Sequence, residues 1–227
     1  MAQQLDLEEQ EQLDQIKHFW KQYGNPITWV LIAILAAYAG WNGYQYWQRN
    51  QAAQASALYD ELERLAAQAD PDKVQRAFAD MKDKFGGTMV ALQAGLLTAK
   101  VQEEAGKVDQ AKAALIWVAD TASDPSYQSI ARLRLAAVLA QAKDYAGAMA
   151  RLEADFPAAF AALVADRKGD LLMLQNKPAL ARAEYQKAYK AFDARTEYRR
   201  LVEIKLTALG ADPLAPAGPA AAAEGKK

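Results

Sequence analysis

Few residue types in this sequence could support catalysis or hold a metal ion. The 227 residues include no cysteine and a single histidine, His18. Thiolate nucleophiles, disulfides and thiolate metal sites are therefore excluded, as is any site that needs two imidazoles, which removes most zinc enzymes. His18 directly precedes Phe19 and Trp20 next to a long apolar run. We therefore interpret His18 as a side chain facing lipid headgroups, in preference to a metal ligand or pH switch.

Neighbouring carboxylates are the remaining candidates for acid–base chemistry. They form two pairs, Asp80 with Asp83 and Glu103 with Glu104. Both pairs lie on expected helix surfaces beside lysines, where solvated ion pairs are the ordinary interpretation. Gly86-Gly87 is an isolated glycine pair and does not have the pattern of a phosphate-binding loop. We therefore expect a protein that is not an enzyme and that has no catalytic residue, metal site or cofactor.

The overall composition predicts a helical chain with no affinity for nucleic acid. Lys and Arg number 27 against 28 Asp and Glu, which gives a net charge of −1. A balanced charge does not predict the basic surface that follows a phosphate backbone. The sequence contains 51 alanines, and alanine is the strongest helix former. We expect an all-α fold.

One stretch of the sequence is apolar and long enough to cross a membrane. No charged residue lies between Lys21 and Arg49, which leaves 27 uncharged residues, and about 20 mostly apolar residues span a bilayer as a helix. Trp and Tyr, which prefer the two membrane–water interfaces, lie at both ends of the stretch. We therefore predict a transmembrane helix over residues 26–48 with Asn25-Pro26 as its start. The predicted aromatic belt consists of Trp20, Tyr23, Trp41, Tyr44, Tyr46 and Trp47.

The alternative interpretations of this stretch are a buried core helix, which the Trp and Tyr at both ends argue against, and a cleaved signal peptide. Ala37-Tyr38-Ala39 fits a small-x-small cleavage site. The preceding segment, however, is long and acidic, whereas a signal peptide begins with a short basic segment. We therefore favour an uncleaved anchor. Lys17 and Lys21 before the stretch, against Arg49 after it, predict a cytoplasmic N-terminus.

The remainder of the chain carries a helical repeat. Ala77, Ala111, Ala148 and Ala181 are separated by 34, 37 and 33 residues, close to the 34-residue helix–turn–helix period of tetratricopeptide repeats. Gly106 and Asn176 occupy expected turns, where a left-handed backbone favours Gly or Asn. Gly169, twelve positions before Ala181, is expected where two helices cross closely. We predict a tetratricopeptide-like solenoid over residues 49–210.

Such arrays bind other chains along the face formed by the first helix of each pair. A projection of the repeat predicts a polypeptide-binding groove lined by eight residues: Tyr59, Leu62, Leu96, Lys100, Ile130, Leu133, Asp170 and Met173. This set is more apolar than charged, which suits an extended or partly unfolded polypeptide. The alternative is that these side chains contact neighbouring helices of the same array.

The two ends of the chain lie outside these segments. Residues 1–25 contain Leu13, Ile16, Trp20 and Tyr23 on one helix face, which predicts an amphipathic segment along the inner leaflet or against a partner. Residues 211–227 are rich in alanine and proline and are predicted to be disordered.

Several short motifs around the apolar stretch resemble the bacterial YfgM family, the ancillary subunit of the Sec translocon. They are Ile16-Lys17 through Trp20, Tyr23 through Pro26, Gly40-Trp41 and Tyr46-Trp47. The resemblance implies a single-span inner-membrane protein with a cytoplasmic N-terminus and a periplasmic repeat domain. As partners it implies the Sec translocon channel, a membrane-anchored periplasmic chaperone of the prolyl-isomerase type and unfolded secretory proteins. The alternatives are an envelope or cell-division adaptor that binds folded partners and, if the topology is inverted, a cytoplasmic signalling protein.

Overall fold

The computed structural model describes residues 7–211, with side chains from residue 13 onward, and these residues contain helices and no strand. The α-helices are α1 (Leu7–Ala67), α2 (Pro71–Phe85), α3 (Met89–Glu104), α4 (Val108–Thr121), α5 (Pro125–Gln141), α6 (Tyr145–Leu152), α7 (Ala161–Leu174), α8 (Pro178–Ala191) and α9 (Glu197–Ala208), with a 3₁₀ turn η1 (Ala158–Phe160) before α7. The predicted all-α fold is confirmed. The tail predicted to be disordered lies beyond the described residues, apart from Ala211.

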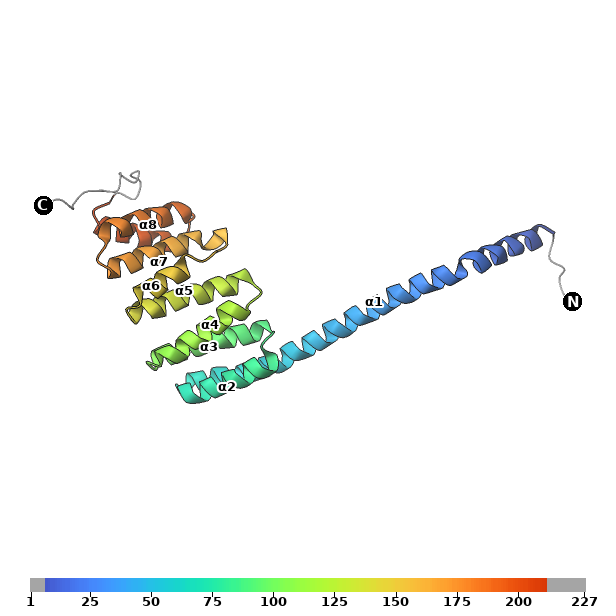
Figure 1. The fold of residues 1–227 in the computed structure, drawn as a ribbon, viewed down its shortest axis with the longest axis horizontal. Helices are drawn as coiled ribbons and strands as arrows, with labels where there is room; N and C mark the ends of the chain where they lie inside the picture. The colour runs from blue at the N-terminus through green and yellow to red at the C-terminus, as the bar shows by residue number, and fades with distance from the viewer. Residues whose placement is uncertain (1–6, 212–227) are drawn as a thin grey trace. The chain divides into compact units, whose positions relative to one another are not determined.

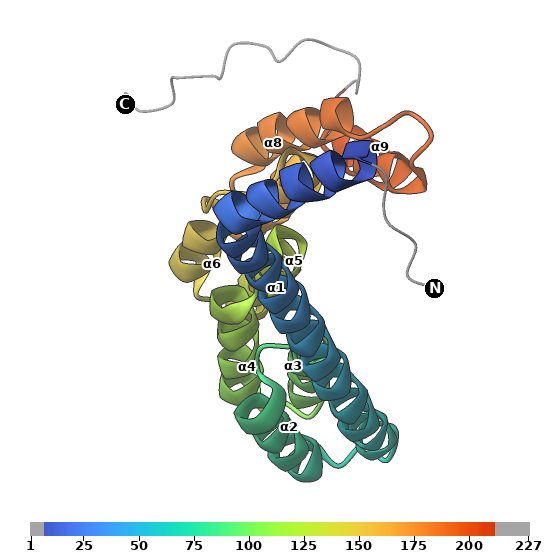
Figure 2. The same ribbon diagram turned by 90° about the vertical axis from the view of Figure 1, so that its right-hand side faces the viewer.

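The chain separates into two compact units, Met1–Ala53 and Gln54–Lys227. In the first unit Pro26 lies inside α1, so the prediction that a helix starts at Asn25-Pro26 is wrong. Proline lacks the N–H that would bond to the carbonyl four residues earlier, and it bends a helix that continues through it. Figure 2 shows the dark-blue N-terminal part of α1 running at an angle to the part that follows. Thr28 Oγ1 donates a hydrogen bond to the Gly24 carbonyl at 2.7 Å in the turn around this proline.

The second unit is a stack of helix pairs (Figure 1). We call the first helix of each pair an A helix and the second a B helix. The A helices are the end of α1, α3, α5, α7 and α9, and the B helices are α2, α4, α6 and α8. Helices from α2 onward pack against the next in the chain, and the A helices α3, α5 and α7 also contact one another in succession. This is the arrangement that the 34-residue period predicts.

Two residues after the end of every A helix lies a residue with a left-handed backbone, here called the turn residue. The turn residues are Ala69 (φ 53°), Gly106 (φ 73°), Lys143 (φ 64°), Asn176 (φ 59°) and Gly210 (φ 66°). After each one, the next N–H donates to a carbonyl five residues back, for example Lys107 to Gln102 at 2.8 Å and Asp144 to Leu139 at 2.9 Å. This is the hydrogen bond of a Schellman cap. The predicted left-handed turns at Gly106 and Asn176 are thus confirmed, whereas Ala69 and Lys143 gave no such signal in the sequence.

The turn residues also correct the register of the predicted repeat. The N–H of Val74 donates to the carbonyl of the residue that precedes α2, and Ala111, Ala148 and Ala181 do the same in their helices. The counterpart of Ala111 is therefore Val74 and not Ala77. The physical reason is that Asp70 caps α2 by accepting from Lys73 N–H, with Pro71 as the first helical residue, so the helix starts earlier than the alanine spacing implied.

Ala69→Gly should raise the free energy of unfolding by about 1 kcal/mol, because a left-handed backbone strains a Cβ and glycine removes that strain. Urea denaturation of the full chain in detergent, followed by circular dichroism, measures the change. Ala67→Gly is the matched control, since Ala67 is the last residue of α1. That change should lower stability by about 0.5–1 kcal/mol. Equal effects of the two substitutions would contradict the assignment of the turn residue.

The apolar core of the stack divides within α7. A first cluster extends from Ala55 and Leu62 to Val164 and Leu171. A second cluster holds Ala165 and Leu172 together with residues of α8 and α9. Gly169 lies against Tyr185 so closely that a Cβ there would be 2.4 Å from the ring atom Cε1. The predicted close crossing at Gly169 is therefore confirmed.

Candidate functional site: the A-helix face and the pocket between α5 and α7

The A helices present two rows of accessible residues, which together we call the A face. One row lies six positions before each turn residue and consists of Glu63, Lys100, Ala137, Asp170 and Ile204. The other lies nine positions before it and consists of Asp60, Leu97, Arg134, Arg167 and Leu201. All of these side chains are exposed or half-buried. The A face is thus more charged than the groove that the sequence predicted.

Two of the predicted groove residues lie in the core and not on this face. Leu62 is fully buried, and Leu96 is 9% exposed. Leu62 lies seven positions before its turn residue, where the other repeats have Ala99, Ala136 and Gly169. In the fourth repeat that position faces the B helix, since a Cβ at Gly169 would meet Tyr185 of α8. Leu62 and Leu96 are therefore not available to a ligand.

The other predicted groove residues differ in their accessibility. Tyr59, Ile130 and Leu133 are half-buried and pack against the first core cluster. Burial and the neighbouring Glu63 carboxylate raise the pKa of Tyr59. Lys100 and Met173 are exposed, and Lys100 forms an ion pair with Glu104 at 3.8 Å. The eight predicted groove residues therefore do not form one accessible surface.

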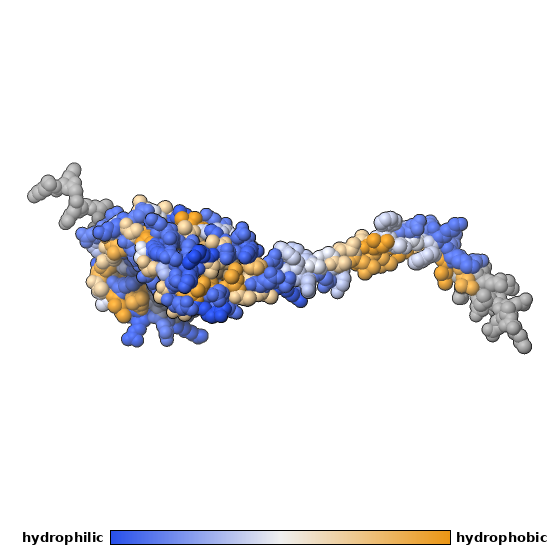
Figure 3. All heavy atoms as spheres, turned by 90° about the horizontal axis from the view of Figure 1, so that it is seen from below, coloured by the Kyte–Doolittle hydropathy of each residue, from blue (hydrophilic) through white to orange (hydrophobic). Residues whose placement is uncertain are grey.

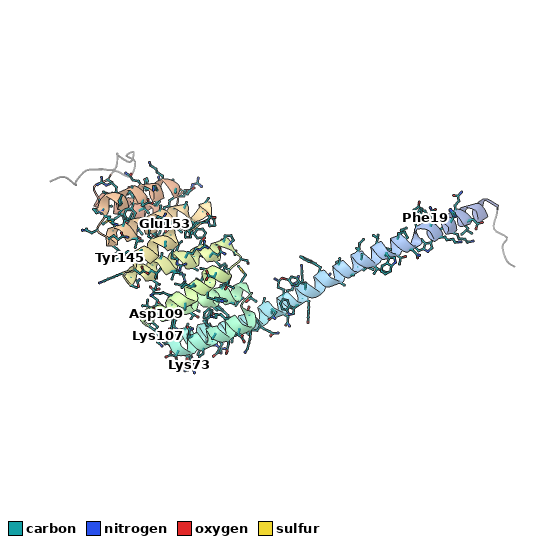
Figure 4. The ribbon with its side chains drawn as sticks, viewed as in Figure 1. Phe19, Lys73, Lys107, Asp109, Tyr145 and Glu153 are labelled. Atoms are coloured by element: carbon teal, nitrogen blue, oxygen red, sulfur yellow. The ribbon has the colours of Figure 1, made fainter. Side chains whose placement is uncertain are left out.

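The structure contains a pocket that the sequence did not predict. It lies between α5, α6 and α7 and has a volume of about 350 Å³. It is lined by Ala136, Ala137, Ala140, Gln141, Lys143, Tyr145, Leu152, Arg167, Asp170, Leu171 and Leu174. Of the predicted groove residues, Asp170 alone lines it. Figure 4 labels Tyr145 and Glu153, which mark the two ends of α6.

Asp170 also belongs to a network of charged and aromatic side chains that joins α7, α8 and α9. Lys205 Nζ lies 2.7 Å from Asp166 Oδ1 and 2.7 Å from Asp170 Oδ1. The Tyr198 hydroxyl donates to Asp166 Oδ2 at 2.8 Å, and the Tyr185 hydroxyl donates to Asp170 Oδ1 at 2.8 Å. Asp166 is completely buried. A buried carboxylate is stable only with such donors around it, so this network holds α9 on the end of the stack.

The two tyrosines of this network stay protonated far above neutral pH. Burial and the hydrogen bond to Asp166 raise the pKa of Tyr198 to about 12. Burial and the hydrogen bond to Asp170 raise the pKa of Tyr185 further above its ordinary value. A raised tyrosine pKa means that the folded state favours the neutral form. Its contribution to stability is present below pH 10 and is lost as the pH rises through the folded-state value.

The apolar part of α1 has the properties of a membrane anchor. Within the helical stretch Leu13–Ala67, a segment of 18 residues has a mean hydropathy of 1.3, and none of its residues is buried. Figure 3 shows hydrophobic residues gathered along one stretch of α1, with hydrophilic residues toward its N-terminal end. All six residues of the predicted aromatic belt are exposed, from 46% for Tyr23 to 76% for Tyr46. These side chains are free to face lipid.

Comparison with known proteins shows the family to which this chain belongs. A tetratricopeptide repeat-like domain family matches residues 17–211. A protein of Neisseria gonorrhoeae described as an ancillary SecYEG translocon subunit is 31% identical over 207 residues, which cover 89% of this chain and 98% of the relative. This chain belongs to the family of ancillary SecYEG translocon subunits.

Relatives of the same description occur in Haemophilus influenzae, with 29% identity over 82% of this chain and 90% of the relative, and in Escherichia coli, with 26% identity over 88% and 96%. No solved structure matches the chain. The predicted family is thereby confirmed, and one apolar helix in an ancillary translocon subunit fits a membrane-anchored protein. The relatives are described as subunits of an assembly, which fits a repeat scaffold.

Proposed function

We propose that this protein is a membrane-anchored, non-catalytic scaffold that associates with the Sec translocon channel, binds secretory chains as they emerge, and passes them to periplasmic chaperones. The observation that supports it most directly is that near-complete relatives are described as ancillary SecYEG translocon subunits. The features of this chain agree: α1 is apolar enough to span a bilayer, and the A face of the repeat unit can contact another polypeptide.

The proposal places residues 1–25 in the cytoplasm, residues 26–48 in the inner membrane and residues 49–210 in the periplasm. Lys17 and Lys21 support this orientation because positive charge favours the cytoplasmic side. In the periplasm the repeat unit would meet chains before they fold. Its proposed chaperone partner is membrane-anchored and of the prolyl-isomerase type, as the family resemblance implies.

Copurification from bacterial membranes in mild detergent tests the association. We expect the wild-type chain to recover the translocon channel. The double substitution Leu31→Arg and Leu35→Arg should abolish both membrane retention and channel recovery, because each arginine at the centre of a membrane helix costs about 2.5–3.5 kcal/mol. The control is Ala79→Arg with Ala113→Arg, which adds two arginines at exposed positions of the B helices α2 and α4 and should change neither result.

Two outcomes would contradict the proposal. Recovery of the channel with the soluble double-arginine variant would show that the anchor is not required. Recovery of a single folded envelope protein, without the channel, would favour the adaptor interpretation. A reporter fused after residue 227 checks the orientation, and activity of that reporter in the cytoplasm would reverse the topology.

A further inference from the structure

The third repeat differs from the others in the length of its B helix. The helix α6 has 8 residues, whereas α2 has 15 and α4 and α8 have 14 each. The chain then continues through a turn and η1 before α7 begins. The A helices α5 and α7, which both contact α6, therefore lie on either side of a B helix about half as long as the others. The 350 Å³ pocket lies at this point of the stack, and the apolar core divides here as well.

The walls of this pocket are apolar. The helix α5 contributes small residues, Ala136, Ala137 and Ala140, which leave the space open, and α7 contributes Leu171 and Leu174. Leu174 is 56% exposed. The volume is near the lower end of the range for ligand pockets, about 300–1,000 Å³. It is too small for a helix and large enough for one or two large side chains.

The charged rim of the pocket favours an anionic neighbour. The carboxylate of Asp170 already receives three donors: the Tyr185 hydroxyl, Lys205 Nζ at 2.7 Å and Arg167 at 3.1 Å. Its negative charge is therefore compensated. Arg167 is one of the cations that balance Asp166 and Asp170, together with Lys205. Lys143 is exposed and is not among the ion-paired residues of the described part of the chain. Lys143 therefore supplies the uncompensated positive charge at the rim.

We infer that this pocket receives one large apolar side chain of an extended polypeptide, and that an acidic residue next to it in that polypeptide pairs with Lys143. The inference rests on the proposed function, because it defines which segments of an unfolded chain the scaffold selects. An extended segment fits, since the pocket opens beside Ala137 and Asp170 on the A face. Burial of the apolar side chain in the pocket supplies the binding energy. The positive charge at the rim selects polypeptide segments with an acidic neighbour.

Three labelled peptides, measured by fluorescence anisotropy with the full chain in nanodiscs, test this preference. The first is a 12-residue Gly/Ser peptide with a central Phe-Asp. The second replaces the Phe by Ser, and the third replaces the Asp by Lys. We expect the second to bind about tenfold or more weakly than the first, since burying a Phe side chain contributes about 1.5–3 kcal/mol. The third should bind about fivefold more weakly, and this difference should shrink in high salt.

Variants of the protein localise the site. Ala137→Trp fills the pocket from an exposed position and should weaken binding of the Phe-Asp peptide about tenfold. Its matched control is Ala113→Trp, which changes an exposed alanine of the B helix α4 that borders no part of the pocket and should leave binding unchanged. Lys143→Gly removes the rim charge at a left-handed position that glycine accepts. It should reduce the discrimination between the Asp and Lys peptides.

The outcomes separate this inference from the proposed function. If the Ala137→Trp variant binds the Phe-Asp peptide as tightly as the wild type does, the pocket is not the binding site. The association with the channel is tested separately by the copurification experiment. Equal affinity for the Asp and Lys peptides overturns the role of Lys143. Failure of the wild type to bind any peptide overturns the inference as a whole, even when the channel is recovered from membranes.

Discussion

We expect Lys205→Met to lower the free energy of unfolding by about 3 kcal/mol, because it leaves a buried carboxylate without its cation. Asp166 is completely buried, and its carboxylate is held by Lys205 at 2.7 Å and the Tyr198 hydroxyl at 2.8 Å. Methionine keeps most of the apolar length of lysine and removes the charge. Asp166 would then retain one neutral donor for a full negative charge. The loss should appear first as faster hydrogen exchange in α9.

Lys187→Met is the matched control for this prediction. Lys187 also forms a short ion pair, with Glu184 at 2.6 Å, but its side chain is 67% exposed. Exposed pairs three or four residues apart on a helix contribute about 0.3–0.5 kcal/mol. Urea denaturation of the full chain in detergent compares the two variants. Similar losses for Lys205→Met and Lys187→Met would show that the network around Asp166 does not hold α9.

Gly169→Ala should lower the free energy of unfolding by about 2 kcal/mol through overpacking. A Cβ at this position would lie 2.4 Å from Cε1 and 2.6 Å from Cδ1 of Tyr185. The ring cannot move away freely, because its hydroxyl donates to Asp170 and Lys205 Nζ lies 5.1 Å from its centroid. The helices α7 and α8 must therefore separate to accept the methyl group.

Gly87→Ala is the control for this second prediction. Nothing lies within 4 Å of a Cβ built at Gly87, and its backbone is not among the positive-φ positions. Alanine there should be neutral or slightly stabilising. Thermal or urea denaturation distinguishes the two glycines, and a Gly169→Ala variant as stable as Gly87→Ala would contradict the close packing of α7 on α8.

The features that the sequence predicted correctly depend on local patterns. The apolar stretch between Lys21 and Arg49 is visible as composition alone, since a bilayer helix needs only length and the absence of charge. The repeat is visible because each pair of helices must bury the same face, which imposes a period on the small residues. Gly106 and Asn176 were recognisable because their side chains suit a left-handed turn.

The features that the sequence predicted poorly depend on register. Leu62 and Leu96 were expected on the groove and lie in the core, because a shift of one or two positions rotates a residue by 100–200° around a helix. That register is set by the turn residues, and Ala69 and Lys143 do not have the residue type that identifies such turns. The prediction at Pro26 failed because proline usually begins a helix, whereas α1 bends and continues.

The sequence by itself determined that this protein has one apolar helix and a series of helix pairs, and it was enough to place the chain in its family. Only the tertiary structure decided the pocket and the network. Asp166 and Lys205 are 39 positions apart, and no local pattern relates them. The pocket lies where α6 is short, between the A helices α5 and α7. The size of that space depends on how distant helices pack, and such packing leaves no period in the sequence.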